Sequence, residues 1–190
     1  MKLCFATNNE NKLREIQSLL GNNFNLITLK DIGCDVDIPE PYLTIAENSH
    51  GKAEYVWQEF GISCFADDSG LEVDALGGAP GVISARYAGP QRNSDDNIAL
   101  LLTKLGSEVN RKARFITVIT LVLDGIYNQF EGTVEGTIIA ERRGLEGFGY
   151  DPIFLPEGHD RTFGEMSLAE KNNLSHRARA FSKLVSFLNS

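Results

Sequence analysis

Residues 2–29 read KLCFATNNENKLREIQSLLGNNFNLITL, and this stretch decides the class of the fold. Residues 2–7 are mostly apolar and predict a buried first strand. Apolar side chains then recur at helical spacing over residues 10–20, at Leu13, Ile16, Leu19 and Leu20. This spacing predicts a helix that ends at Gly21, and residues 24–29 predict a second, short strand. The alternation of strand and helix favours an α/β fold.

The middle of the chain adds a loop, a helix and a strand. Residues 31–42 hold two prolines and several acids, which predicts a loop. Residues 44–47, TIAE, match a capping box and open a predicted helix that runs to about Phe60. Residues 63–66 predict a core strand, whereas residues 70–89 are rich in glycine and predict irregular structure.

A β-hairpin is predicted in the second half of the chain, after a helix over residues 94–105. Residues 114–123 predict the longest apolar strand and are rich in β-branched side chains. The dipeptide Asp124-Gly125 is a turn signal that leads into strands between Tyr127 and Arg143, and the C-terminal segment is predicted to be helical. Because early strand–helix alternation is combined with a hairpin, we expect a mixed sheet rather than a purely parallel one.

Length and composition restrict the class of protein. A chain of 190 residues is long enough for one hydrophobic core and short for two, which predicts a single domain over residues 1–190. Hydrophobic residues make up 42% and charged residues 23%, and these values exclude disordered and fibrous classes. Acidic residues exceed basic ones by 26 − 18 = 8, so we expect no nucleic-acid partner, because the negative charge repels a phosphate backbone.

The sequence also bears on location. No stretch approaches the roughly 18 consecutive apolar residues of a membrane span, and the apolar start at residues 3–6 is too short for a signal peptide. We therefore expect a cytoplasmic protein with no membrane partner. Cys4, Cys34 and Cys64 show no CxxC spacing and each lies beside apolar residues, which predicts buried reduced thiols.

The junction of the first predicted strand and helix, residues 7–12, reads TNNENK. Free backbone N–H groups and the helix dipole favour an anion at such a junction. An ordinary capped helix start would also explain the asparagines. Lys12 favours the anion site, because a cation in the first turn opposes the dipole by roughly 0.3–1 kcal/mol, and a bound phosphate would offset that cost. The Walker motif GxxxxGK[ST] is absent from the sequence.

Residues 65–70, FADDSG, place two carboxylates at the end of an apolar strand. Successive side chains of a strand point to opposite faces, so Asp67 and Asp68 are not expected to share one pocket. One of them is expected to hold Mg²⁺ or to accept a proton from water, and the other to hold the turn. An ordinary Asx-turn would explain the pair without any chemistry.

Residues 147–152, GFGYDP, place glycines on both sides of an aromatic ring. Glycine lets the backbone approach a ligand closely, and the ring of Phe148 offers a face on which a base can stack. The carboxylate of Asp151 can accept hydrogen bonds from ring N–H groups. A turn whose Phe148 returns to the core would explain the same pattern.

Residues 170–177, EKNNLSHR, come just before the apolar stripe of a last helix. Their charges would form a solvated face if they served no other purpose. On one continuous helix His176 and Arg177 would lie roughly 140° and 120° around the axis from Lys171, too far apart to converge. We therefore predict a break at residues 173–175, with a serine cap at the start of each helix.

Taken together and in this order, four segments resemble the inosine/xanthosine triphosphate pyrophosphatase family. They are ATNNENK (residues 6–12), FADDSGLEVDALGGAPGVISARYAG (65–89), GFGYDPIFLPEG (147–158) and TFGEMSLAEKNNLSHRARA (162–180). The chain departs from the family pattern at Ile45, where the family usually has Phe, and at Ser49, where it usually has Ala. Gly164 replaces a commoner Ala.

The resemblance implies an elongated α/β fold, in which a mixed sheet is flanked by helices and two lobes enclose a nucleotide cleft. It also implies a homodimer and Mg²⁺-dependent cleavage of purine nucleoside triphosphates such as ITP, dITP and XTP between the α- and β-phosphates. The products would be the nucleoside monophosphate and pyrophosphate.

Site residues carry over by motif. The residues that resemble the triphosphate-binding set are Thr7, Asn8, Asn9, Asn11, Lys12 and Lys52. Glu40 and Asp68 resemble the acidic pair at the metal, with Asp68 also activating water and Ser69 beside it. The nucleoside-binding side would comprise Phe148, Gly149, Tyr150, Asp151, Lys171, His176 and Arg177. A donor such as His176 or Arg177 can bind a 6-oxo purine and would oppose the 6-amino group of adenine.

Two alternatives remain open at this point. A Maf-like nucleotide pyrophosphatase would share the architecture and the chemistry, although the chain lacks a Ser-rich and Arg-rich opening. A catalytically silent nucleotide-binding module is the other alternative. Because Lys12, Glu40, Asp67 and Asp68 are all present, the sequence gives no sign of lost activity.

Overall fold

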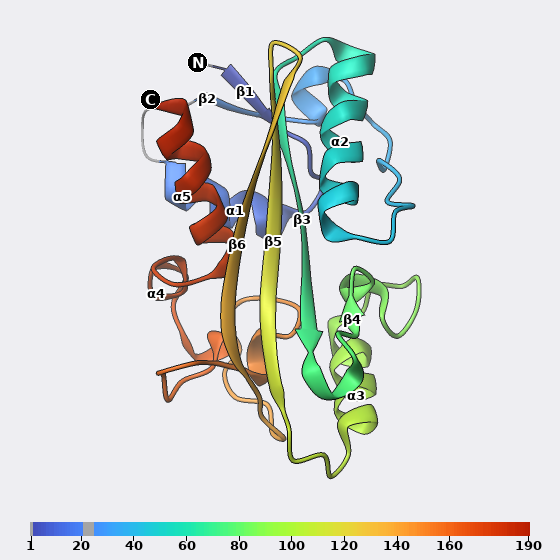
Figure 1. Cartoon of the computed structure of the whole chain (residues 1–190), viewed down its shortest axis with the longest axis vertical. Coiled ribbons are helices and arrows are strands. Elements are labelled where there is room, and N and C mark those ends of the chain that lie inside the picture. The colour runs from blue at the N-terminus through green and yellow to red at the C-terminus, as the bar shows by residue number, and fades with distance from the viewer. Residues whose placement is uncertain (1, 21–24) are drawn as a thin grey trace. The chain divides into compact units, whose positions relative to one another are not determined.

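The computed structural model describes residues 2–20 and 25–190, and Figure 1 shows their helices and strands. The chain forms two compact units. Unit 1 comprises residues 1–68, 117–132 and 177–190, and unit 2 comprises residues 69–116 and 133–176. Three long strands contribute residues to both units: β3 (Cys64–Val73), β5 (Lys112–Leu123) and β6 (Ile126–Ile138).

Unit 1 has the α/β character that residues 2–29 predict. Strand β1 (Lys2–Phe5) lies between two parallel neighbours, β2 (Asn25–Thr28) and β3, with Cys4 opposite both Ile27 and Cys64. Within the described part of the sheet, β5 and β6 follow β3. The helices of this unit are α1 (Glu10–Leu20), α2 (Ile45–Phe60) and most of α5 (His176–Leu188), with a 3₁₀ turn at Lys30–Ile32.

The sheet of unit 1 is covered on both faces. Figure 1 shows α1 and α5 on one side of its strands and α2 on the other. One face carries the odd-numbered residues of β1 and β3 together with residues of α1 and α5: Leu3, Phe5, Phe65, Ile16 and Phe181. The other face carries the even-numbered residues together with residues of α2: Cys4, Cys64, Ala66, Ala53 and Val56. Burial on both faces explains why these strands are continuously apolar.

Unit 2 has its own apolar core. Helix α3 (Ser94–Leu105) contributes Ile98, Leu101 and Leu105 to it. Two short strands pair antiparallel with the long ones: β4 (Pro80–Gly81) with β3, and β7 (Phe154–Pro156) with β6. The other elements are α4 (Leu168–Asn172) and 3₁₀ turns at Asp74–Leu76, Ser84–Arg86, Asp151–Ile153 and Phe163–Glu165. Parallel and antiparallel pairs together confirm the predicted mixed sheet.

Most predicted helices and turns are confirmed. The bounds of α1 and α3 are as predicted, and α2 begins after Thr44, whose side chain accepts a hydrogen bond from the backbone N–H of Glu47. Asp124 and Gly125 turn between β5 and β6 with φ of 49° and 82°. The predicted break before the last helix separates α4 from α5. The predicted helix end at Gly21 and strand start at Phe24 lie outside the described residues.

One strand prediction is wrong. Strand β3 does not end at residue 66 but runs to Val73, so both aspartates lie inside the strand rather than in a turn after it. The apolar run that predicted the strand ends at Ala66, and the polar side chains of Asp67 and Asp68 gave no sign that the strand continues. Irregular structure, predicted for residues 70–89, is found after β3, where Gly77 and Gly78 have φ of 61° and 87°.

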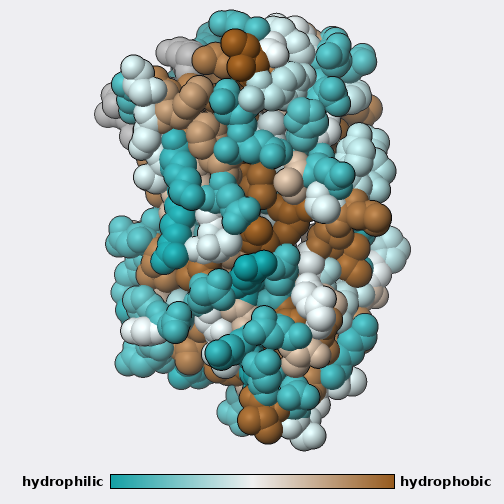
Figure 2. Space-filling model, in the orientation of Figure 1, coloured by the Kyte–Doolittle hydropathy of each residue, from teal (hydrophilic) through white to brown (hydrophobic). Residues whose placement is uncertain are grey.

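Burial agrees with the prediction made for the cysteines. Cys4, Cys34 and Cys64 are free and buried, as predicted, and burial raises the pKa of Cys4 and of Cys64 to about 12. Among the described residues, no helix is long and apolar enough to cross a membrane. Figure 2 shows a face on which polar residues predominate and apolar residues are scattered among them.

Candidate active site

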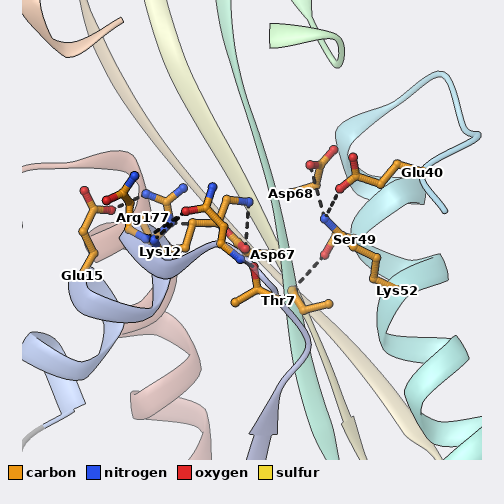
Figure 3. Close-up of polar contacts among 12 residues, drawn as sticks. Thr7, Lys12, Glu15, Glu40, Ser49, Lys52, Asp67, Asp68 and Arg177 are labelled. Carbon is orange, nitrogen blue, oxygen red and sulfur yellow. Dashed lines mark hydrogen bonds and ion pairs between the residues drawn. The ribbon is translucent and has the colours of Figure 1, made fainter. Parts of the chain in front are cut away.

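The two aspartates of β3 point to opposite faces of the strand and contact different partners (Figure 3). Asp67 follows the odd-numbered residues and faces α1 and α5, whereas Asp68 follows the even-numbered residues and faces α2. The predicted separation of the pair is therefore confirmed, and the alternation of a strand is its cause. Each aspartate is the centre of its own polar cluster in unit 1.

The Asp67 cluster is a buried set of ion pairs. Lys12 of α1 donates to Asp67 Oδ1 at 3.0 Å, and Arg177 Nε of α5 donates to Asp67 Oδ2 at 3.1 Å. A further guanidinium nitrogen of Arg177 donates to Glu15. The Asp67 side chain is 0% exposed. Burial by itself would raise the pKa of Asp67, but Lys12 and Arg177 outweigh burial and hold this pKa well below its ordinary value.

The start of α1 explains where Lys12 points. Asn9 Oδ1 accepts hydrogen bonds from the backbone N–H groups of Asn11 and Lys12 at 3.0 and 3.2 Å, which is the capped helix start weighed above. Thr7 Oγ1 accepts from Asn9 N, and Asn8 Nδ2 donates to Asp37 at 3.1 Å. Asp67 thus supplies the negative charge that offsets Lys12 in the helix's first turn.

The Asp68 cluster is smaller and more open. Lys52 of α2 donates to Glu40 Oε1 at 2.6 Å and lies 3.5 Å from Asp68 Oδ1. The Asp68 and Lys52 side chains are 9% and 8% exposed, and that of Glu40 is 27% exposed. Burial, together with the negative charges of Glu40 and Asp67, raises the pKa of Asp68 despite the two nearby lysines.

One oxygen of this cluster has no partner among the described residues. Asp68 Oδ2 is buried and makes no hydrogen bond there. Buried polar oxygens are normally satisfied, so an unsatisfied one beside a second carboxylate fits a divalent cation or a water molecule. The part of the chain that the structure describes holds no group of three metal-binding side chains. Two carboxylates nevertheless suffice for Mg²⁺, which commonly takes one or two together with phosphate oxygens and water.

A third cluster lies in unit 2. Asp151 Oδ2 accepts hydrogen bonds from Lys171 Nζ at 2.6 Å and from the backbone N–H of Phe148 at 2.8 Å. The Lys171 ammonium lies 4.9 Å from the centre of the Phe148 ring. Gly147 must be glycine, because its φ is +75° and a Cβ there would collide with the Asp151 carboxylate. The loop is therefore folded around Asp151, with Phe148 half-buried at its surface.

Some predicted site residues pack against, or bind to, other side chains of the protein. Tyr150 packs in the apolar core of unit 2 and its hydroxyl donates to the Ser84 carbonyl at 2.9 Å. The His176 ring stacks on Phe115, with centres 4.7 Å apart. Arg177 is buried in the Asp67 cluster of unit 1, so its guanidinium belongs with Lys12. The ligand contacts predicted for these residues, and for Ser69 and Gly149, stay predictions.

Sequence reasoning missed two buried polar residues. Glu15 is 4% exposed and binds Arg177. Its signal was present, because it follows Lys12 by three residues on the buried side of α1, next to Ile16. Asn48 is 1% exposed and bonds the backbone of Tyr42, a contact between a helix and the preceding loop that no spacing rule predicts.

Comparisons with known proteins identify relatives of this chain over nearly its full length. A sequence profile described as the Ham1 family matches residues 3–187. A protein of Flavobacterium psychrophilum named dITP/XTP pyrophosphatase is 52% identical over 187 residues, 98% of each chain. A protein of the same name from Christiangramia forsetii is 53% identical over 188 residues, 99% of each chain. The solved structure of the Staphylococcus aureus Ham1 protein superposes with a TM-score of 0.91 at 37% identity, over 100% of this chain and 98% of that one.

Proposed function

Since the chain belongs to the Ham1 family, we propose that it hydrolyses non-standard purine nucleoside triphosphates (ITP, dITP and XTP) to the monophosphate and pyrophosphate. The observation that carries the proposal is the Asp68 cluster, in which a buried carboxylate oxygen lies beside Lys52 and Glu40 and makes no hydrogen bond with any described residue. Relatives that match almost the full length of this chain are named for the same activity, which disfavours the Maf-like alternative.

Cations and backbone donors would bind the triphosphate. Lys52 is a cation beside the two carboxylates, and burial, which lowers its pKa, is outweighed by Asp68 and Glu40, so it stays charged. The N-terminus of α1 offers backbone N–H groups and a positive dipole. Lys12 is held at that end by Asp67. Phosphoryl transfer depends mainly on positioning and charge neutralisation, and these groups supply both.

Asp68 would accept the proton of the attacking water. As the water oxygen bonds to phosphorus, the bridging P–O bond between the α- and β-phosphates breaks, and pyrophosphate leaves. The proton lost by water goes to Asp68, whose raised pKa makes it a better acceptor than an ordinary aspartate. Asp68 and Glu40 would hold Mg²⁺, which when bound neutralises charge on the phosphate oxygens.

The nucleoside would bind at residues 147–151 of unit 2. The face of Phe148 suits stacking on a base, and Lys171, fixed by Asp151, is a donor next to that ring. His176 is the candidate donor for a purine 6-oxo group. Its ring is held by Phe115, which would fix the direction of such a hydrogen bond.

Further properties follow from the same assignment. We propose that residues 1–190 act as one catalytic domain, since β3, β5 and β6 contribute to both units. A cytoplasmic location suits an enzyme of the nucleotide pool and its three free thiols. The homodimer implied by the resemblance is testable by light scattering.

One assay tests the activity. Pyrophosphate release is measured from ITP, dITP, XTP, ATP and GTP, with Mg²⁺ and with a chelator. We expect pyrophosphate release from ITP, dITP and XTP when Mg²⁺ is present, and none when the chelator is present. Binding of these nucleotides without any release would instead identify the silent nucleotide-binding module.

A further inference from the structure

Glu40 lies in a loop, and two residues after Glu40 this loop is hydrogen-bonded to helix α2. Asn48 of α2 accepts a hydrogen bond from the backbone N–H of Tyr42 at 3.0 Å and donates to the Tyr42 carbonyl at 3.0 Å. Both hydrogen-bonding groups of one loop residue are thus held by one buried side chain. Among the described residues, the Asn48 side chain makes no hydrogen bond with Lys52 or Asp68. Its effect on the Asp68 cluster therefore passes through Tyr42.

A glycine completes the attachment. Gly51 lies one turn after Asn48, inside α2, where glycine is unfavourable compared with alanine. A Cβ at Gly51 would lie 2.6 Å from Cε2 of Tyr42 and 3.4 Å from Cδ2. The absence of a side chain therefore makes room for the Tyr42 ring on the helix. Asn48 holds the backbone of Tyr42, and the Tyr42 ring, which is 44% exposed, lies against Gly51.

The link from Tyr42 to Glu40 is stiff. Pro41 lies between them and Pro39 precedes Glu40. Proline fixes its own φ and restricts the residue before it to extended conformations. Fixing Tyr42 on α2 therefore fixes Glu40 two residues earlier, where Lys52 of the same helix binds it at 2.6 Å.

We propose that Asn48 and Gly51 are positioning residues, which hold Glu40 in place for the divalent cation through Tyr42 and Pro41. The proposal rests on the proposed function in one respect, the assignment of Glu40 and Asp68 to the cation. It adds that the distance between the two carboxylates is set on α2, the helix that also carries Lys52. Removing the attachment weakens binding of the cation more than it slows the reaction at saturating cation.

The first test is Asn48→Ala in the full-length protein. We expect the Mg²⁺ concentration for half-maximal pyrophosphate release to rise by about tenfold, the usual effect of removing a group that orients a metal ligand. The rate at saturating Mg²⁺ should stay within about threefold of wild type. Hydrogen exchange of the backbone at residues 39–43 should accelerate in the metal-free variant, which is a readout independent of turnover.

Asn97 provides a matched control. It is 4% exposed in α3 of unit 2, accepts from Ala88 N at 2.7 Å and donates to the Ala85 carbonyl at 3.0 Å. Asn97→Ala removes the same kind of attachment from a loop without an assigned metal ligand. Its Mg²⁺ requirement should change by less than about twofold. An equal rise in both variants would overturn the proposal, as would faster exchange at residues 39–43 in Asn48→Ala with an unchanged Mg²⁺ requirement.

Gly51→Ala gives a second, independent test should Asn48→Ala fail to fold. It should raise the melting temperature or leave it unchanged, because alanine favours a helix, and still raise the Mg²⁺ requirement, because the Cβ displaces Tyr42. In a Tyr42→Ala background the collision is gone, so Gly51→Ala should then change the requirement by less than about twofold. An equal effect in both backgrounds would overturn the proposal.

The two proposals fail in different ways. If wild type releases no pyrophosphate from any triphosphate, the proposed function is wrong. The positioning role is then decided by Mg²⁺ titration of hydrogen-exchange protection at residues 39–43. A shift to higher Mg²⁺ in Asn48→Ala supports it, whereas identical titrations, or no protection by Mg²⁺ in wild type, overturn it.

Discussion

The neighbouring aspartates allow a sharp test, because the same isosteric substitution should lower stability at Asp67 and lower the reaction rate at Asp68. Asp67→Asn removes the charge that Lys12 and Arg177 share in a fully buried site. Removing one partner of a buried ion pair leaves uncompensated charge and costs about 3–5 kcal/mol. For a chain of this size about 2–4 °C is lost per kcal/mol, so the melting temperature should fall by roughly 6–20 °C.

Asp68→Asn should leave stability intact and abolish turnover. Burial raises the pKa of Asp68, so its charged form is disfavoured in the folded protein and a neutral amide relieves that cost. Lys52 keeps its closer partner Glu40 at 2.6 Å. We expect a change in stability within about 1 kcal/mol, in either direction, and a rate at least ~10² lower.

Thermal melts by circular dichroism, alongside pyrophosphate release, separate the two variants. The sign of the pH dependence adds a check. The pKa of Asp67 is depressed below its ordinary value of 3.8, so its stabilisation is present above pH 3.8 and is lost as the pH falls below it. The gap between wild type and Asp67→Asn should therefore narrow in acid. Equal melting temperatures for both variants, or Asp68→Asn retaining wild-type rates, would refute the assignment of roles.

Three further outcomes are expected. Chromatography of an ITP reaction with Mg²⁺ should show the monophosphate and pyrophosphate with no diphosphate, and accumulating diphosphate with orthophosphate would move the cut to the terminal phosphate. Arg177→Ala and Lys12→Ala should each lower turnover of ITP and of any residual ATP by similar factors, because both cations belong to the Asp67 cluster. A selective loss of ITP turnover in Arg177→Ala would return Arg177 to base recognition. Iodoacetamide at pH 8 should leave Cys4 and Cys64 unmodified until denaturant is added, since burial raises both pKa values to about 12. Rapid modification of either thiol in the native protein, detected by mass spectrometry, would contradict this.

Much of the fold was predictable because its signals are local. Helical spacing and capping residues predicted α1, α2 and α3. The Asp124-Gly125 dipeptide predicted the turn, in which both residues have positive φ. The opposite orientation of Asp67 and Asp68 also follows from sequence, since a strand alternates whatever packs against it. The length of β3 was not predictable. Polar residues 67–69 look like a loop until their partners on other elements are known.

The partners of each charge were decided only by tertiary structure. From sequence alone Lys12 is a cation opposed to a helix dipole, and Arg177 is a free donor near the C-terminus. Packing α1 and α5 on the same face of the sheet brings both to Asp67, which is 55 residues from Lys12 and 110 from Arg177 along the chain. Local patterns fix backbone conformation and side-chain direction, whereas the pKa of a buried group depends on charges that long-range packing assembles around it.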